Sequence, residues 1–412
     1  MSILKDFSLS TVTAGFVSAL VGLATGVALI FEAANRLGAT DAQVSSWVWA
    51  LCMGMGVLTF VPSLLLRMPA MVAFSAPGAV VLATLAPGEF TLAQGIGAFI
   101  LNGVAMAIVG FTGLFERFMD RIPGPLAAAL LAGVIARFAV VGFVDAKTAP
   151  WLVLFATAAY LVTRQFAPAY AVVGMLVVGV LTSLASGSMQ TEQLTLSLAK
   201  PIAVAPTFTL AAFVGITIPL FVVTMAGQNL PGVAAYRGSG YDVPTSKMLG
   251  ATGLGTVALA SFGGFTFNLS AVMAMICVHP STHPDPRRRY TAALAAGAFY
   301  LLAGTLGSSI TGLLRAFPPE LVHIVASLAL APVVTSSLTA AVREDKHRDA
   351  ASLTFLVTLS GVSVGPIGSP LWGAAAGLAA TALASARFRA VLRRPSARRA
   401  EPGPAVASGV DR

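Results

Sequence analysis

Charged residues are scarce in this chain. Only 10% of its 412 residues are Asp, Glu, Lys or Arg, and 57% are hydrophobic, whereas soluble domains carry about 25% charged residues. Cysteine is almost absent, and because Cys52 and Cys277 lie singly in apolar runs, a disulfide framework and a zinc site are excluded. The composition also excludes a disordered chain and an ordinary cytosolic enzyme, and it indicates a polytopic membrane protein.

The basic residues are few and unevenly placed. The net charge is +9, with arginines gathered in the C-terminal tail and at Arg287, Arg288 and Arg289. The other basic residues stand singly between apolar runs, which is typical of charges that orient a membrane protein. We therefore expect no nucleic-acid partner. The chain has no P-loop lysine motif, so ATP-driven transport on this chain is also not expected.

The apolar runs predict an all-α polytopic membrane protein. A helix needs about 20 apolar residues to cross the bilayer, and fourteen runs approach this length, seven before and seven after the polar stretch 186–193. They are 9–31, 44–66, 69–86, 92–115, 123–143, 148–163 and 167–186, then 207–228, 245–262, 263–278, 290–312, 317–342, 350–368 and 370–387.

The positive-inside rule orients these segments. With the N-terminus in the cytoplasm, 20 of the 25 basic residues lie on the cytoplasmic side. The remaining five would face outward: Arg36, Arg137, Lys147, Lys200 and Arg315. We predict that both termini are cytoplasmic and that residues 393–412 form a disordered basic tail.

The two halves contain an internal repeat. Gly97-Ala98-Phe99 returns as Gly297-Ala298-Phe299, and similar Gly-Leu and Pro-containing motifs follow each copy. An odd number of segments per copy inverts the second copy, which is a recurrent plan of secondary transporters. We predict 7+7 inverted repeats, with residues 1–190 as the first repeat and 191–392 as the second.

Two segments at matching places do not resemble ordinary helices. The third contains Ser75-Ala76-Pro77-Gly78, and the tenth contains Gly263-Gly264-Phe265 followed by Asn268. Proline removes a backbone donor and glycine adds freedom, so we predict short β-stretches joined to half-helices in segments 3 and 10. Free N–H groups at the N-terminus of each half-helix would suit an anionic ligand.

A polar cluster ends the eighth segment. It runs from Thr224 through Gln228 and Asn229 to Pro231-Gly232. Amides within a membrane are costly and tend to face a cavity. The alternative interpretation is a helix C-cap at Asn229 and Pro231-Gly232, and the two interpretations are compatible.

Other motifs do not support catalysis or metal binding. Gly361-Val-Ser363-Val-Gly365 matches a hydrolase pattern but lies in an apolar span without the strand–turn–helix context. His279, His283 and Asp285 are separated by prolines, so we interpret them as a solvated loop. We therefore predict no catalytic residue, no metal and no cofactor.

Together these motifs resemble the benzoate:proton symporter family of BenE-type transporters. The resemblance rests on Thr224–Gly232 with Gly240-Tyr241, on Phe262–Leu269 with His283-Pro-Asp-Pro, and on Phe74–Gly78. It spans about Phe7 to Leu392 and implies bacterial inner-membrane import of benzoate or a similar aromatic carboxylate with protons. It also implies the fold of the uracil/xanthine and sulfate permeases, and it leaves open a homodimer.

The resemblance further implies two domains with different roles. A core domain would comprise about 9–117 and 207–312, and a gate domain about 123–186 and 317–392. The substrate would bind between the breaks of segments 3 and 10, beside segment 8. The site residues carried over are Ser75, Ala76, Pro77, Gly78, Gln228, Asn229, Gly263, Gly264, Phe265 and Asn268.

One departure from the related nucleobase permeases bears on the substrate. Their glutamates in segments 8 and 10 are replaced by Gln228 and Gly264, and a site without carboxylates suits an anion. Only Glu32, at the outer end of segment 1, adjoins a span directly, and it is the proton-coupling candidate; pairing with Arg36 is the alternative. Importers of another weak acid or of a nucleobase-like ring, and an intramembrane enzyme, are the competing interpretations.

Overall fold

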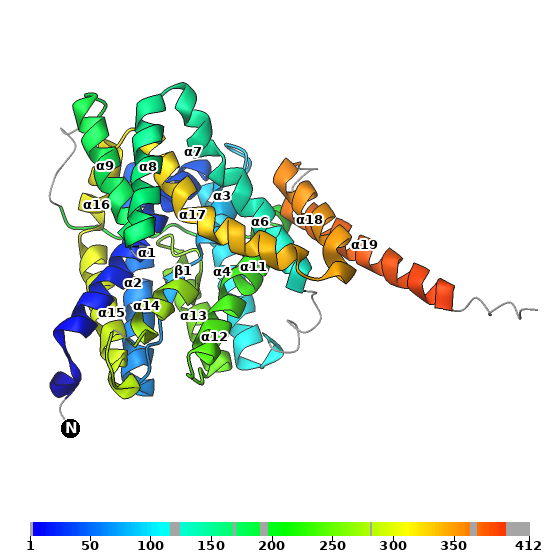
Figure 1. The fold of residues 1–412 in the computed structure, drawn as a ribbon, viewed down its shortest axis with the longest axis horizontal. Coiled ribbons are helices and arrows are strands. Elements are labelled where there is room, and N and C mark those ends of the chain that lie inside the picture. Colours follow the sequence, from blue (N-terminus) through cyan, green and yellow to red (C-terminus); the bar gives the residue numbers. More distant parts are fainter. Residues whose placement is uncertain are drawn as a thin grey trace, which may run out of the picture.

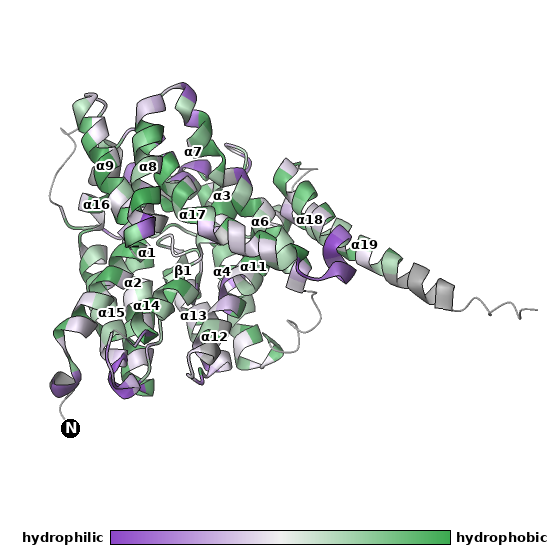
Figure 2. Ribbon diagram, in the orientation of Figure 1, coloured by the Kyte–Doolittle hydropathy of each residue, from purple (hydrophilic) through white to green (hydrophobic). Residues whose placement is uncertain are grey.

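The structure is a computed structural model that describes residues 3–115, 124–167, 170–189, 197–280, 282–362 and 369–392. The predicted basic tail, much of the central polar stretch and Ser363 lie outside these residues. Helices make up most of the molecule, and a two-stranded sheet lies near its centre (Figure 1). Hydrophobic residues cover most helices, and hydrophilic residues gather at the connections (Figure 2).

Three helices of the first half have starts that are set by local side-chain bonds. Capping boxes at Ser8–Thr11, Thr40–Gln43 and Thr91–Gln94 begin α1, α2 and α4, because each side chain satisfies an N–H group that the helix leaves free. The elements are η1 (Ile3–Asp6), α1 (Leu9–Arg36), α2 (Asp41–Leu66), β1 (Val72–Phe74), α3 (Ala76–Ala83), α4 (Leu92–Phe111), α6 (Gly124–Ala139), α7 (Val141–Val144), η2 (Asp145–Lys147), α8 (Pro150–Phe166) and α9 (Ala171–Ala185).

The second half repeats this order with a more irregular first segment. Its elements are α10 (Leu210–Ala212), the π-helix η5 (Phe213–Thr217), α11 (Ile218–Thr224), the π-helix η6 (Met225–Asn229), α12 (Leu230–Gly238), α13 (Thr245–Ala260), β2 (Phe267–Leu269), α14 (Ala271–Val278), η7 (Pro286–Arg288), α15 (Tyr290–Thr305), α16 (Gly307–Ala316), α17 (Pro319–Val342), η8 (Asp345–His347), α18 (Arg348–Ser360) and α19 (Ser369–Leu392). By length and hydropathy alone, five described helical stretches can cross a membrane: Asp41–Leu66, Leu92–Phe111, Gly124–Lys147, Leu210–Val233 and Pro319–Val342.

Helix contacts in one half have counterparts in the other. Helix α4 packs along α13, and α2 packs along α15; exchanging the two halves converts one pair into the other. The pair α8–α9 corresponds in the same way to α18–α19, and α6 packs against its own counterpart α17. The packing therefore has the two-fold symmetry expected of repeated halves.

Segments 3 and 10 contain short β-strands as predicted, and the two strands cross at the centre of the molecule. Strands β1 and β2 pair in antiparallel register, Val72 with Leu269, Ala73 with Asn268 and Phe74 with Phe267. The Ser75 N–H donates to Thr266 O, and the Ser270 N–H donates to Met71 O. This arrangement is symmetric about the Ala73–Asn268 pair, so equivalent residues of the two segments differ by 268 − 73 = 195 positions.

Three predictions about segment boundaries need correction. The helix of segment 8 does not end at Asn229–Gly232: it continues as α12 to Gly238, because the π-turn before Pro231 accommodates a residue without an N–H group. The extended stretch of segment 10 is confined to Phe267–Leu269, after a turn at 261–263. Segment 11 is interrupted at Leu306, between α15 and α16.

Candidate functional site

The two half-helices begin on either side of the strand crossing. The Ser75 Oγ accepts a hydrogen bond from the Gly78 N–H at 3.0 Å, and the Ser270 Oγ accepts one from the Met273 N–H at 3.3 Å. Ser75 and Ser270 are equivalent in the repeat, since they are 195 positions apart. The motifs indicated Ser75 but not Ser270. Placing the predicted β-stretches of the two segments opposite each other, in place of the glycine-containing motifs, would have indicated Ser270 as well.

Each half-helix start leaves backbone donors available. The first four N–H groups of a helix have no intrahelical acceptor. In α14 the Ala271 and Val272 N–H groups occupy such positions, whereas in α3 Pro77 has no N–H and only Ala76 contributes a comparable donor. Ala76 and Ala271 are partly exposed, while Ser75, Pro77 and Gly78 are buried. The crossing therefore presents a small set of donors suited to an anion.

Segment 8 passes the crossing through its second π-helix. The Thr224 hydroxyl donates to Ser75 Oγ at 2.9 Å, which fixes α11 against α3. Gln228 lies in the π-helix, where its side chain is half-buried and its Oε1 accepts from Asn268 Nδ2 at 3.5 Å. π-turns within helices occur frequently at functional sites. Gln228 therefore faces the crossing.

The neighbouring amide, Asn229, holds the strand. Its Oδ1 accepts the Leu269 N–H at 3.0 Å, and its side chain is fully buried. This bond satisfies the backbone of β2, so the Asn229 carbonyl oxygen is already engaged. By contrast, the buried Asn268 Oδ1 has no hydrogen-bond partner among the described residues, and the Asn268 amide lies between Gln228 and the backbone of Leu269.

Gly263, Gly264 and Phe265 lie behind the crossing. Gly263, with φ of 98°, donates its N–H to Ala260 O, and Gly264 donates to Leu259 O. These two bonds form a Schellman motif that ends α13. Phe265 is fully buried and packs against the rings of Trp47, Phe74 and Phe99. The structure thus groups Ser75, Ala76, Gln228 and Asn268 at the crossing and leaves these three residues outside that group.

Buried carboxylates are absent from the described residues, where Arg289 is the one charged residue among the buried polar side chains. Glu32, the proton-coupling candidate, lies near the end of α1, and its Oε1 is 2.7 Å from Arg36 Nε. The pair is partly exposed, with about a third of each side chain accessible. The pairing of Glu32 with Arg36 is therefore present, and a role of Glu32 in proton coupling stays a prediction.

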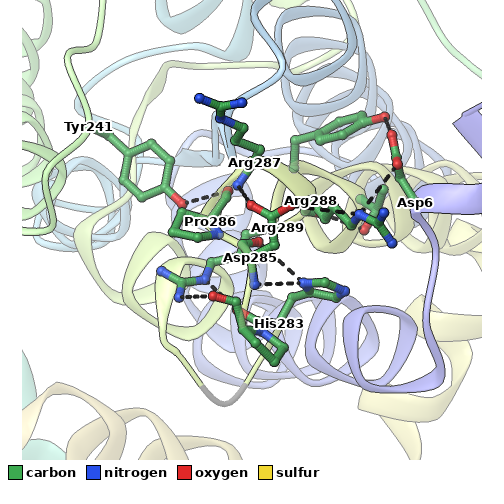
Figure 3. Close-up of polar contacts among 11 residues, drawn as sticks. Asp6, Tyr241, His283, Asp285, Pro286, Arg287, Arg288 and Arg289 are labelled. Atoms are coloured by element: carbon green, nitrogen blue, oxygen red, sulfur yellow. Dashed lines mark hydrogen bonds and ion pairs between the residues drawn. The ribbon is translucent and has the colours of Figure 1, made fainter. Parts of the chain in front are cut away.

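The loop after α14 forms a polar network at the same end of the molecule as the N-terminus (Figures 1 and 3). Arg289 donates to Val278 O, at the end of α14, and to His283 O, each at 2.8 Å. Asp6 accepts from the Tyr290 hydroxyl at 2.8 Å, and the Tyr241 hydroxyl donates to Pro286 O at 3.1 Å. Burial raises the pKa of the Tyr241 hydroxyl, partly offset by Arg289. The residues singled out for metal-like spacing therefore form a partly solvated loop that fixes the C-terminal end of α14.

Comparison with known proteins identifies the family. The profile of the family described as "Benzoate membrane transport protein" matches residues 5–383. The inner membrane protein YdcO of Escherichia coli (strain K12) is 40% identical over 89% of this chain and 94% of its own length. The benzoate membrane transport protein of Acinetobacter baylyi is 33% identical over 91% of this chain and 95% of its own.

Solved structures identify the fold. The transmembrane domain of the cyanobacterial bicarbonate transporter BicA superposes with a TM-score of 0.58 at 13% identity, covering 90% of this chain and 97% of that one. SLC26A9 gives a TM-score of 0.61 at 12% identity, covering 94% and 67%. The chain has the all-α membrane fold of fourteen segments in two inverted repeats of seven, and it belongs to the benzoate membrane transport protein family.

Proposed function

We propose that this protein imports benzoate or a similar aromatic carboxylate together with protons across the bacterial inner membrane. The observation that carries the proposal is the crossing of β1 and β2, where two half-helices begin beside Gln228 and no buried carboxylate occurs among the described residues. Backbone donors at helix starts attract an anion. A buried acid would repel one. The chain's family and its relative from Acinetobacter baylyi support the same substrate class.

The substrate's two ends would meet different surroundings. The carboxylate would accept from the Ala271 and Val272 N–H groups and from the Gln228 or Asn268 amide. The ring would lie against apolar side chains such as Leu131 of α6, which faces segment 8 at Gly227. Burying apolar area contributes about 25 cal/mol per Å², and the amides set the orientation. Ser75, Pro77, Gly78 and Asn229 would shape the site, with Gly263, Gly264 and Phe265 supporting it from behind.

The proposal includes the division into moving parts. Residues 9–117 and 207–312 would form the core that carries the site, and residues 123–186 and 317–392 the gate. Support comes from the pairs α4–α13 and α2–α15 on one side and α6–α17 on the other. Alternating access would follow from motion of one group against the other. The proposal also includes cytoplasmic termini and a homodimer. Native mass spectrometry tests the homodimer.

Glu32 is the proposed proton carrier. It adjoins the end of α1 and pairs with Arg36 at 2.7 Å. Protonation of Glu32 would remove the charge that holds Arg36, so proton uptake and a local rearrangement would be linked.

The decisive experiment is transport by the purified protein in liposomes. We expect an inwardly directed proton gradient to drive benzoate accumulation and benzoate, but not uracil, to raise the thermal unfolding midpoint. Uracil stabilisation without benzoate stabilisation would favour the nucleobase-like alternative. Absence of benzoate transport under any gradient would overturn the proposal.

A further inference from the structure

Two cavities lie at opposite ends of the molecule. The first, of about 840 Å³, lies at the N-terminal end of α1 and is lined by Thr13, Val17, Tyr170, Met275, Ile276 and His279. The second, of about 300 Å³, includes Arg36 at the other end of α1. Helix α1 has 28 residues, so at about 1.5 Å per residue the cavities are separated by most of a bilayer thickness.

The repeat relates these cavities to each other. With the offset of 195 fixed by the strand pairing, Ile276 and His279 correspond to Val81 and Thr84, and both of these line the smaller cavity. The larger cavity uses α1 and the start of α9 at Tyr170, and the smaller one uses Gly215 of segment 8 and the start of α19 at Ser369. They are therefore the same place in the two inverted halves.

The half-helices show which end is open. Met275 of α14, which lines the larger cavity, is 46% exposed, whereas its equivalent Val80 of α3 is buried. The structure is thus open toward the end that holds the N-terminus and narrowed at the other end. With the orientation proposed above, the larger cavity faces the cytoplasm and the smaller one faces outward.

The cavities also differ in chemistry. The larger one is lined mainly by apolar side chains, while the smaller one includes Arg36, Glu89 and Arg137. Arg36 is paired with Glu32, and Glu89 accepts the Ala86 N–H at 3.1 Å. Arg137, near the end of α6, is exposed and has no acidic partner among the described residues. Its guanidinium lies beside Gly361, at the end of α18.

We propose that the smaller cavity is an outer entry site for the substrate's carboxylate, with the Arg137 guanidinium as its ligand. A guanidinium offers paired donors that match a carboxylate. The volume is at the lower end of the 300–1,000 Å³ typical of ligand pockets, about the size needed for one small aromatic acid. The cavity is bounded by Val81 and Gly215 on one side and by Arg137 and Ser369 on the other, so a ligand there lies between the proposed core and gate.

This inference rests on the proposed function, and transport measured from each side tests it. In liposomes of fixed orientation, Arg137→Gln should raise the KM for benzoate uptake about tenfold, the effect of losing one charge-assisted hydrogen bond. The maximal uptake rate and the KM for efflux should stay unchanged. The maximal efflux rate should fall about tenfold, because a substitution cannot alter the equilibrium across the membrane and must change the ratio of maximal rate to KM equally in both directions. Arg137→Lys, which keeps the charge, should recover most of the loss. Lys147→Gln is the matched control, because Lys147 is exposed in η2 and does not line the cavity.

The uptake and efflux measurements decide whether Arg137 forms an entry site. An unchanged uptake KM in Arg137→Gln overturns the entry site, and so does an equal rise of KM in both directions, which would mean that Arg137 acts on closure. Thermal unfolding of the variant at the wild-type midpoint confirms that the protein is folded. Failure of the wild-type protein to transport benzoate would overturn the proposed function instead, so the two failures are distinguishable.

Discussion

At the scale of single residues, two adjacent amides have different tasks. Asn229 accepts the Leu269 N–H and holds β2 in place, whereas Gln228 is half-buried and faces the crossing with only a long contact to Asn268. The difference arises because successive side chains of a helix point in different directions, so the two neighbours meet different parts of the crossing. Substitution at the two positions should therefore separate binding from stability.

Gln228→Ala should reduce benzoate uptake at least tenfold without loss of folded protein. A hydrogen bond to a charged ligand contributes about 1.5–3 kcal/mol, and 1.4 kcal/mol is about tenfold in affinity. Radiolabelled uptake in liposomes measures the effect. Gln165→Ala, at the exposed end of α8, is the control and should behave as wild type; equal uptake by both variants would contradict a binding role for Gln228.

Asn229→Ala should act through stability. It leaves the buried Leu269 N–H without an acceptor, which costs about 1–3 kcal/mol. We expect a lower thermal midpoint in detergent and a smaller folded yield, with residual binding in the molecules that fold. A variant with unchanged stability and lost binding would assign Asn229 to the substrate instead.

Glu32→Gln tests the proton route. If Glu32 carries the proton, the variant should lose pH-driven accumulation and retain benzoate counterflow, since exchange needs no net proton movement. Accumulation assays with and without a pH gradient distinguish the two activities. Intact pH-driven accumulation would eliminate Glu32 and leave the proton to travel with the substrate or by another route.

At the scale of elements, the half-helices and the cap of α13 position the crossing. Gly263 has a φ of 98°, and a side chain there would collide with the Trp47 ring. A Cβ atom at Gly264 would lie 2.8 Å from Leu259 Cβ. The two glycines therefore fix where β2 begins, and they act on the site through the backbone.

Gly264→Leu should consequently impair transport more than Gln228→Ala does, and it should do so by destabilising the end of α13. We expect a lower thermal midpoint together with the loss of uptake. Loss of uptake in a variant with the wild-type midpoint would show instead that the side chain obstructs the substrate.

At the scale of the whole molecule, the orientation of the protein in the membrane determines which end of the molecule faces the cytoplasm. Native Cys52 and Cys277 are buried, so thiol labelling can report on cysteines introduced at the surface. A cysteine at Ser2 and one in the basic tail should react only after the membrane is permeabilised. Labelling of the tail in intact cells would contradict the predicted topology.

The sequence by itself determined the membrane class, the fourteen segments and the presence of breaks in segments 3 and 10, because hydropathy, basic-residue placement and Pro or Gly are local properties. Motif resemblance added the family. The resemblance also supplied Ser75 as a site residue, whereas the sequence itself indicated Gln228, since an amide within an apolar run is conspicuous.

Only the tertiary structure decided which of these residues meet. Gly263 and Gly264 carry the same local signal whether they bind a ligand or cap a helix, and the Schellman bonds to α13 assign them to the cap. Ser270 became equivalent to Ser75 only through the pairing of Ala73 with Asn268. The unequal exposure of α3 and α14 depends on how the two halves pack against each other. No single stretch of sequence contains this information, because the two inverted halves specify similar half-helices and only their packing makes one buried and the other exposed.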